Sequence, residues 1–212
     1  MNLKYSLIFL ATLGLLMLAL FIFYRPGPPP YTPIEPRRFH TDLYLLPFVF
    51  FDNLDNSNLD KYRAINASLE FSNDSLFLGA DQKRGLLLTR TSFSNASYQA
   101  EIALAPDSNK GAGIVFLSDP NDTDRDYELI LRNGKLILLK DRAEIKQWEI
   151  LANLTRYAYL KVKFEGGGYS FWLDGYKIGN LDEAAYFAGV AGLVNYDQRP
   201  AEFAFFAVNR EN

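Results

Sequence analysis

Short apolar runs separated by turn residues recur along most of this chain, and they constrain its fold more than any other feature. Between residues 48 and 208, runs of β-branched, leucine and aromatic residues alternate with Gly, Asn, Asp and Pro, and no 3.6-residue apolar period is sustained. The predicted strands are 48–51, 69–71, 75–78, 85–89, 98–104, 112–117, 127–132, 135–140, 146–150, 159–164, 169–173, 176–178, 189–194 and 202–208. Within this β-rich region only residues 182–188 are predicted to form a helix. The dipeptides Asn133-Gly134 and Asp174-Gly175 suit the positive φ angles of type I′ hairpins. The pattern predicts an all-β antiparallel sandwich or barrel.

A second feature divides the chain before this β-rich region. Residues 6–23 are apolar without a break, and a proline-rich stretch follows them. As a helix rising about 1.5 Å per residue, residues 5–24 are just long enough to cross a hydrocarbon core of about 30 Å. We therefore expect a transmembrane anchor at residues 1–24, an extended linker at 25–38 and one β-domain at 39–212. A cleaved signal peptide is the alternative, although the run is long for one and lacks a good cleavage site.

The orientation of the anchor is less directly determined by the sequence. Lys4 precedes the apolar run, whereas Arg25, Arg37 and Arg38 follow it, and this bias alone would place the domain in the cytoplasm. Five Asn-x-Ser/Thr sequons favour the opposite side, because they act only where a glycosyltransferase is present. These candidate glycosylation sites are Asn66, Asn73, Asn95, Asn121 and Asn153. We expect a single-pass membrane protein whose C-terminal domain is extracytoplasmic.

Composition excludes several kinds of chemistry. The chain has no cysteine, so it has no disulfide, no thiolate nucleophile and no cysteine metal site. Residues 39–212 hold 18 basic and 24 acidic residues, a net charge of −6. This charge disfavours nucleic acid as a partner.

The order of strand and turn motifs resembles the concanavalin A-like lectin and glucanase superfamily, and is similar to laminin-G-like jelly rolls and to 3-keto-disaccharide hydrolase-type domains. The segments that carry this resemblance are 98–102 (YQAEI), 111–116 (GAGIVF), 126–130 (DYELI), 159–163 (YLKVK), 171–175 (FWLDG), 189–193 (GVAGL) and 203–205 (FAF). The resemblance implies a two-sheet antiparallel jelly-roll sandwich over residues 45–210. Its motifs are structural, so they support a fold and not an activity.

No catalytic residue can be named from the sequence. Relatives of this fold that hydrolyse polysaccharides resemble one another in a Glu-x-Asp-x-(x)-Glu strand, whose carboxylates act as nucleophile and general acid. Neither Glu101 nor Glu128 is followed by carboxylates at alternate positions, and the single histidine, His40, lies at the edge of the linker. The sequence therefore favours a non-catalytic domain.

One loop has the composition of a cation site. Oxygen-bearing side chains crowd into residues 119–126, at Asp119, Asn121, Asp122, Asp124 and Asp126. Calcium prefers such ligands, and the resemblance to laminin-G-like and lectin domains implies calcium in loops at one end of the sandwich. The loop lacks the glycine and the closing glutamate of an EF-hand. A polar hairpin loop without metal is the alternative.

Four aromatic residues are candidates for contact with a glycan or a partner protein. Phe171 is expected in the core, so strand alternation turns Trp172 outward, where an indole ring can stack on a sugar. Tyr176, Trp148 and Tyr196 could join it, although most of the 32 aromatics must be core residues or ordinary surface.

Three functions remain open at this point. The first is a membrane-anchored module that recognises glycan or protein, and it is the one we expect. The second is a structural accessory subunit of a larger membrane complex. The third is a hydrolase of a modified disaccharide.

Overall fold

The computed structural model describes residues 48–210 apart from 55–58, 73–74, 95–97, 106–109, 151–156, 166, 183–184 and 187. The predicted anchor, the linker and His40 lie outside these ranges. Within them, no helix is long and apolar enough to span a membrane.

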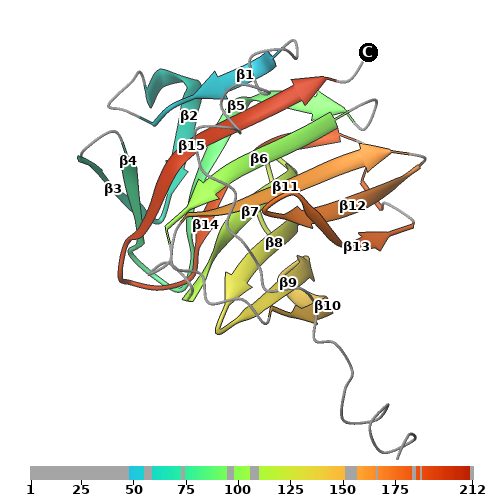
Figure 1. Cartoon of the computed structure of the whole chain (residues 1–212). Coiled ribbons are helices and arrows are strands. Elements are labelled where there is room, and N and C mark those ends of the chain that lie inside the picture. Colours follow the sequence, from blue (N-terminus) through green and yellow to red (C-terminus); the bar gives the residue numbers. More distant parts are fainter. Residues whose placement is uncertain are drawn as a thin grey trace, which may run out of the picture. The chain divides into compact units, whose positions relative to one another are not determined.

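The described residues form two antiparallel β-sheets (Figure 1). Sheet A has the order β13-β12-β11-β6-β15-β4-β3, and β1 also pairs with β15. Its strands are β1 (Phe48–Asp52), β3 (Ala67–Ser72), β4 (Ser75–Ala80), β6 (Tyr98–Leu104), β11 (Ala158–Glu165), β12 (Gly168–Leu173), β13 (Tyr176–Leu181) and β15 (Ala201–Arg210).

Sheet B has the order β10-β9-β8-β7-β14-β5-β2. Its strands are β2 (Tyr62–Ile65), β5 (Gly85–Ser94), β7 (Lys110–Ser118), β8 (Tyr127–Arg132), β9 (Lys135–Lys140), β10 (Ala143–Glu149) and β14 (Ala188–Asn195). A short 3₁₀ helix, η1 (Leu59–Lys61), precedes β2.

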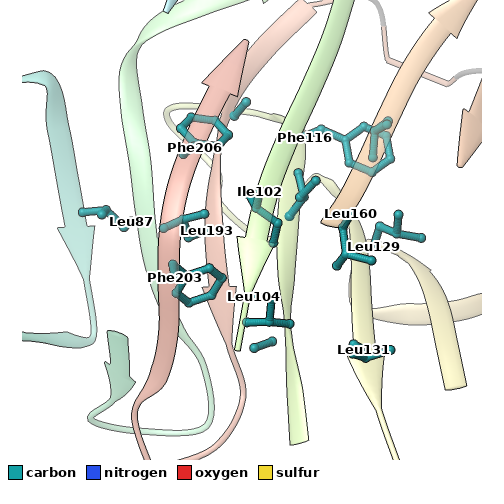
Figure 2. Close-up of a cluster of buried hydrophobic side chains, with 14 of the residues drawn as sticks. Leu87, Ile102, Leu104, Phe116, Leu129, Leu131, Leu160, Leu193, Phe203 and Phe206 are labelled. Carbon is teal, nitrogen blue, oxygen red and sulfur yellow. The ribbon is translucent and has the colours of Figure 1, made fainter. Parts of the chain in front are cut away.

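The main core lies between the two sheets. Alternate residues of each strand point into it, among them Phe116, Leu129, Leu160 and Phe206, and each of these four is fully buried (Figure 2). Phe171 also lies in this core, as the sequence predicted. Gly192 of β14 permits a close approach, because a Cβ there would lie 2.0 Å from the carbonyl oxygen of Leu87.

The predicted all-β class, two-sheet architecture and hairpins are confirmed. Asn133 and Gly134 have φ angles of 51° and 75°, and Asp174 and Gly175 have 50° and 83°, as type I′ turns require. Every predicted strand lies within an observed strand or overlaps it closely, but the sequence analysis missed β2.

The predicted helix at residues 182–188 is wrong. Asp182 and Ala185 lie in bends, and Ala188 already begins β14. The connection from β13 to β14 is short, and the backbone N–H of Ala185 donates to the Tyr127 hydroxyl at 3.0 Å. A tertiary hydrogen bond thus takes a donor that a helix would use.

Candidate functional site

The loop between β7 and β8 leans across the outer face of sheet B. Arg63 of β2 donates a hydrogen bond to the Pro120 carbonyl at 2.9 Å, and Arg84, just before β5, donates to the Thr123 carbonyl at 2.7 Å. In sheet B, β14 and β5 separate β7 from β2. The loop is therefore fastened to strands beyond its immediate neighbour, and we call residues 119–125 the crossing loop.

A buried charge cluster lies beside this loop. Arg84 forms ion pairs with both Asp126 and Glu128, and the two carboxylates are fully buried while Arg84 is 7% exposed. The Tyr196 hydroxyl donates to Glu128 Oε2 at 2.6 Å. The Arg132 guanidinium lies 5.1 Å from the centre of the Tyr196 ring. We call Arg84, Asp126, Glu128 and Tyr196 the Arg84 cluster.

Burial sets the electrostatics of this cluster. Loss of hydration, followed by the neighbouring Glu128 charge, raises the pKa of Asp126 to about 7. Burial also raises the pKa of Glu128, against the opposing effect of Arg84. Burial acts to lower the pKa of Arg84, but Glu128 and Asp126 outweigh it and raise that pKa. The arginine therefore stays charged and the carboxylates hold protons more readily than usual.

A polar pocket of about 510 Å³ opens beside the Arg84 cluster. Its residues come from the β2–β3, β4–β5, β9–β10 and β14–β15 connections and from the strands β2 and β5, and Thr123 of the crossing loop forms part of its wall. The lining consists of Ile65, Asn66, Gln82, Lys83, Arg84, Leu86, Thr123, Arg142 and Gln198. Amide and guanidinium groups thus share this pocket with two aliphatic side chains.

The predicted calcium ligands do not converge on one point. Asp119 Oδ1 accepts the Asn121 N–H at 2.8 Å, and Asp122 Oδ1 accepts the Asp124 N–H at 3.2 Å. The Asp124 carboxylate pairs with Arg142, and that of Asp126 with Arg84. Within the described ranges, no three acidic or histidine side chains are grouped to hold a metal ion. As placed, these residues do not fit calcium.

The four predicted aromatic contacts separate into different environments. Trp172 lies on the outer face of sheet A, half-buried, with its indole N–H on Ser170 Oγ at 3.2 Å and Lys161 Nζ 5.5 Å from its ring centre. Tyr176 begins β13 and is 53% exposed. These two residues belong to adjacent strands, β12 and β13.

Trp148 and Tyr196 do not share that surface. The Trp148 ring packs 5.6 Å from Phe171 in the core, and it fills the space beside Gly179 of β13, where a Cβ would lie 2.3 Å from the ring. Tyr196 belongs to the Arg84 cluster on sheet B. Strand alternation alone did not reveal these positions. Trp148 lies on β10, an edge strand of sheet B, and Tyr196 lies just after the end of β14.

Two of the five sequons lie within the described residues. Asn66 and Asn121 are both exposed, and Asn66 has a φ of 49° and lines the polar pocket. Asn73, Asn95 and Asn153 lie outside the described ranges.

Sequence reasoning did not bring together the residues of the polar pocket or those of the Arg84 cluster. A signal existed for one pair, because Asp126 precedes Glu128 by two positions and so shares its face of the sheet. Nothing in the sequence links Arg84 to these carboxylates, which lie 42 and 44 positions later, and Gln82 and Gln198 belong to connections without a regular pattern.

Comparison with known proteins was made by sequence and by structure. No family model and no curated protein matches the chain. Several solved structures do match it. The carbohydrate-binding module CBM66 from Bacillus subtilis is 16% identical with a TM-score of 0.61, over 70% of this chain and 95% of its own. A Bacillus subtilis protein of unknown function with a galectin-like fold is 15% identical with a TM-score of 0.63, over 77% of this chain and 96% of its own.

A third match is the carbohydrate recognition domain of Emp46p in its potassium-bound form. It is 10% identical with a TM-score of 0.57, over 74% of this chain and 94% of its own. Identities this low show a shared fold and nothing finer. With its two antiparallel sheets, the chain has the fold of the concanavalin A-like jelly-roll sandwiches.

Proposed function

We propose that this protein is a membrane-anchored, non-catalytic, extracytoplasmic module that binds saccharide in the polar pocket beside the Arg84 cluster. The observation that carries the proposal is the pocket itself, in which amide and guanidinium groups surround a space of about 510 Å³. Small-ligand pockets commonly have volumes of about 300–1,000 Å³. The solved structures of similar fold include a carbohydrate-binding module and a carbohydrate recognition domain, which adds support by analogy.

The pocket chemistry suits a polyhydroxylated ligand. The side chains of Asn66, Gln82 and Gln198 each offer donors and an acceptor, so they can satisfy sugar hydroxyl groups in either sense. Ile65 supplies an apolar surface for the C–H face of a ring, and the buried Leu86 lies behind the pocket wall. Arg84 is held in place by two carboxylates, so its position costs little further ordering when a ligand binds.

The carboxylates of the cluster support a non-catalytic reading. Glycoside hydrolysis needs one carboxyl group on each side of the scissile bond. Asp126 and Glu128 are fully buried and both pair with Arg84. They orient the arginine and do not face the pocket themselves.

The membrane anchor and the orientation remain proposals from the sequence. The apolar run at residues 6–23 and the prolines after it support an anchor with a stiff spacer. Calcium is not part of the proposed function, because arginines engage two of the five predicted ligands.

The test begins with full-length protein purified in mild detergent and applied to a glycan array. For any glycan that binds, titration calorimetry then compares the Gln82→Ala and Gln198→Ala variants with the unaltered protein. We expect each to weaken binding roughly three- to tenfold, as the loss of one neutral hydrogen bond implies. Trp172→Ala on sheet A is the matched control and should leave the affinity unchanged. If only Trp172→Ala weakens binding, the pocket is not the site.

A structural accessory subunit of a membrane complex is the second candidate. Trp172 and Tyr176 on sheet A favour it, because neither lines the polar pocket and aromatic residues are common in protein interfaces. Mass spectrometry of the same detergent preparation distinguishes the two functions. Stoichiometric membrane partners would support the accessory role, whereas a lone protein would support saccharide binding.

A further inference from the structure

Sheet A carries apolar side chains on the face that points away from the core. Phe206, Ile102 and Leu160 belong to the core between the sheets. Their chain neighbours Phe205, Ala103 and Tyr159 therefore point the opposite way, as strand alternation requires. A separate apolar cluster forms there, which we call the outer cluster, and it consists of Ala103, Tyr159, Phe205 and Ala207 with Phe51, Tyr157 and Ala204 packed against it.

The outer cluster is buried as deeply as a core. Phe205 is 1% exposed, Ala103 is 1%, Ala207 is 0% and Tyr159 is 7%. The Phe205 ring lies 6.4 Å from that of Phe51 and 5.9 Å from that of Tyr159. Side chains on an open sheet face of four strands would keep much more contact with water. This face of the domain is therefore covered.

A buried polar group nearby supports the same conclusion. Asn209 lies two positions beyond Ala207 on β15, so it shares the outer face. It is 1% exposed, and neither Nδ2 nor Oδ1 of its side chain has a hydrogen-bond partner. A primary amide is rarely removed from water in this way, so a covering segment that brings its own polar groups close to Asn209 is favoured.

None of the described strands lies over this face of sheet A (Figure 1). The internal stretches outside the described ranges are at most six residues long. The chain before β1 is much longer. It leads directly to this face, because β1 pairs with β15 and contributes Phe51 to the outer cluster. The cover is therefore best sought immediately before Phe48.

We propose that residues 39–47 (FHTDLYLLP) fold back from β1 and cover the outer cluster. Fully extended, these nine residues reach roughly 30 Å. The outer cluster spans β1, β15, β6 and β11, a width of about 15 Å at the usual strand spacing. Phe39, Leu43, Tyr44, Leu45 and Leu46 supply the apolar surface that this face requires.

The test uses the absence of native cysteine. A single Ala207→Cys substitution places one thiol in the outer cluster of the full-length protein, and maleimide labelling measures its exposure. A Tyr176→Cys variant, with its thiol on the exposed β12–β13 hairpin, gives the reference rate for an open position. We expect the thiol at position 207 to react at least tenfold more slowly than the thiol at position 176.

The second arm disrupts the proposed cover. Leu43→Asp and Leu45→Asp together, in the Ala207→Cys background, should raise the labelling rate at position 207 at least tenfold. Tyr31→Asp and Ile34→Asp form the matched control, because they add the same charge within the linker and should change nothing. The proposal is overturned if position 207 labels rapidly in the unaltered chain, since the face would then be open. It is equally overturned if labelling stays slow in the Leu43→Asp/Leu45→Asp variant, since another occupant would then cover it.

A disulfide experiment separates the chain's own segment from a second copy. Ala207→Cys is combined in turn with Asp42→Cys, Leu43→Cys or Leu45→Cys, and each protein is oxidised in detergent. We expect at least one pair to form an intramolecular disulfide, which requires Cα atoms within about 7 Å. Disulfide-linked dimers in place of intramolecular bonds would show that a neighbouring molecule covers the face and would contradict the proposal.

Discussion

Arg84 connects two parts of the outer face of sheet B, the buried carboxylates and the crossing loop. It forms ion pairs with Asp126 and Glu128, and it also holds the crossing loop through the Thr123 carbonyl. A buried ion pair adds little net stability compared with apolar residues, but removing one partner leaves an uncompensated charge. Removing Arg84 should therefore lower the stability of the protein strongly, whereas breaking an exposed ion pair nearby should change it little.

Arg84→Met should lower the free energy of unfolding by about 3–5 kcal/mol near pH 8. The loss should shrink near pH 5, because burial raises the pKa of Asp126 to about 7 and that carboxyl group then takes up a proton. Arg142→Met is the control, because Arg142 and its partner Asp124 are 51% and 58% exposed, and it should cost at most about 1 kcal/mol. Urea denaturation at the two pH values measures both. Equal losses for both variants would show that the Arg84 cluster is not a buried charge network.

Asp174 offers a test in which the substitution should raise the stability of the protein. Its side chain accepts the Tyr159 N–H at 2.7 Å, but burial raises its pKa to about 6. In the unfolded chain its pKa is near 3.8. The native protein therefore holds this proton more tightly, and the stability contributed by the group is lost as pH rises from about 4 through 6.

Asp174→Asn should raise stability by about 1–3 kcal/mol at pH 8 and have little effect at pH 4. The amide oxygen can still accept the Tyr159 N–H, and Asn-Gly is the preferred type I′ pair. Guanidinium denaturation at several pH values provides the measurement. A variant that is destabilised at pH 8 would mean that the ionised carboxylate is needed in the native turn.

At the residue scale, the sequence showed which side chains could bind a ligand or an ion, but not which side chains they contact in the folded protein. Asp126 was predicted to bind calcium because its neighbours in sequence also bear oxygen atoms. Its side chain is instead buried beside Arg84 on the outer face of sheet B, and only the folded chain brings that arginine close. Trp172 was placed on the correct face because alternation within one strand is a local property.

At the scale of elements, strands with a clear apolar pattern were predicted well. Tyr98–Leu104, Tyr127–Arg132 and Lys135–Lys140 have the bounds that the sequence indicated. β2 was missed because Tyr62–Ile65 is short and has two exposed residues at its centre. Its pairing with β5 determines its conformation, and that pairing is invisible to local propensity.

The contacts of the crossing loop lead us to expect that calcium does not change the melting temperature of the protein. Hydrogen bonds and ion pairs from Arg63, Arg84 and Arg142 already hold the loop and its flanking carboxylates. A ligand that binds only the native state raises its melting temperature. We therefore expect the same melting temperature in excess calcium and in chelator, measured by differential scanning calorimetry. A rise of several degrees with calcium would show that the loop rearranges to bind it, and magnesium at the same ionic strength is the control.

At the scale of the whole molecule, the orientation of the domain in the membrane can be tested directly. Tyr176 is 53% exposed and the chain has no native cysteine, so Tyr176→Cys introduces a single accessible site for labelling. In intact cells of the native host, a membrane-impermeant maleimide should label this variant almost fully. Leu173→Cys, buried in the core, is the matched control and should remain unlabelled until the protein is denatured. Labelling of Tyr176→Cys only after cell lysis would place the domain in the cytoplasm.

The position of β15 in sheet A has a consequence for biosynthesis. β15 pairs with β6 on one side, and with β4 and then β1 on the other, so it is central although it follows every other described strand in the chain. A ribosome must therefore release the whole sandwich sequence before sheet A can close. Until then β1 and β6 both present unpaired edges, and the nascent domain depends on whatever shields those edges during translation.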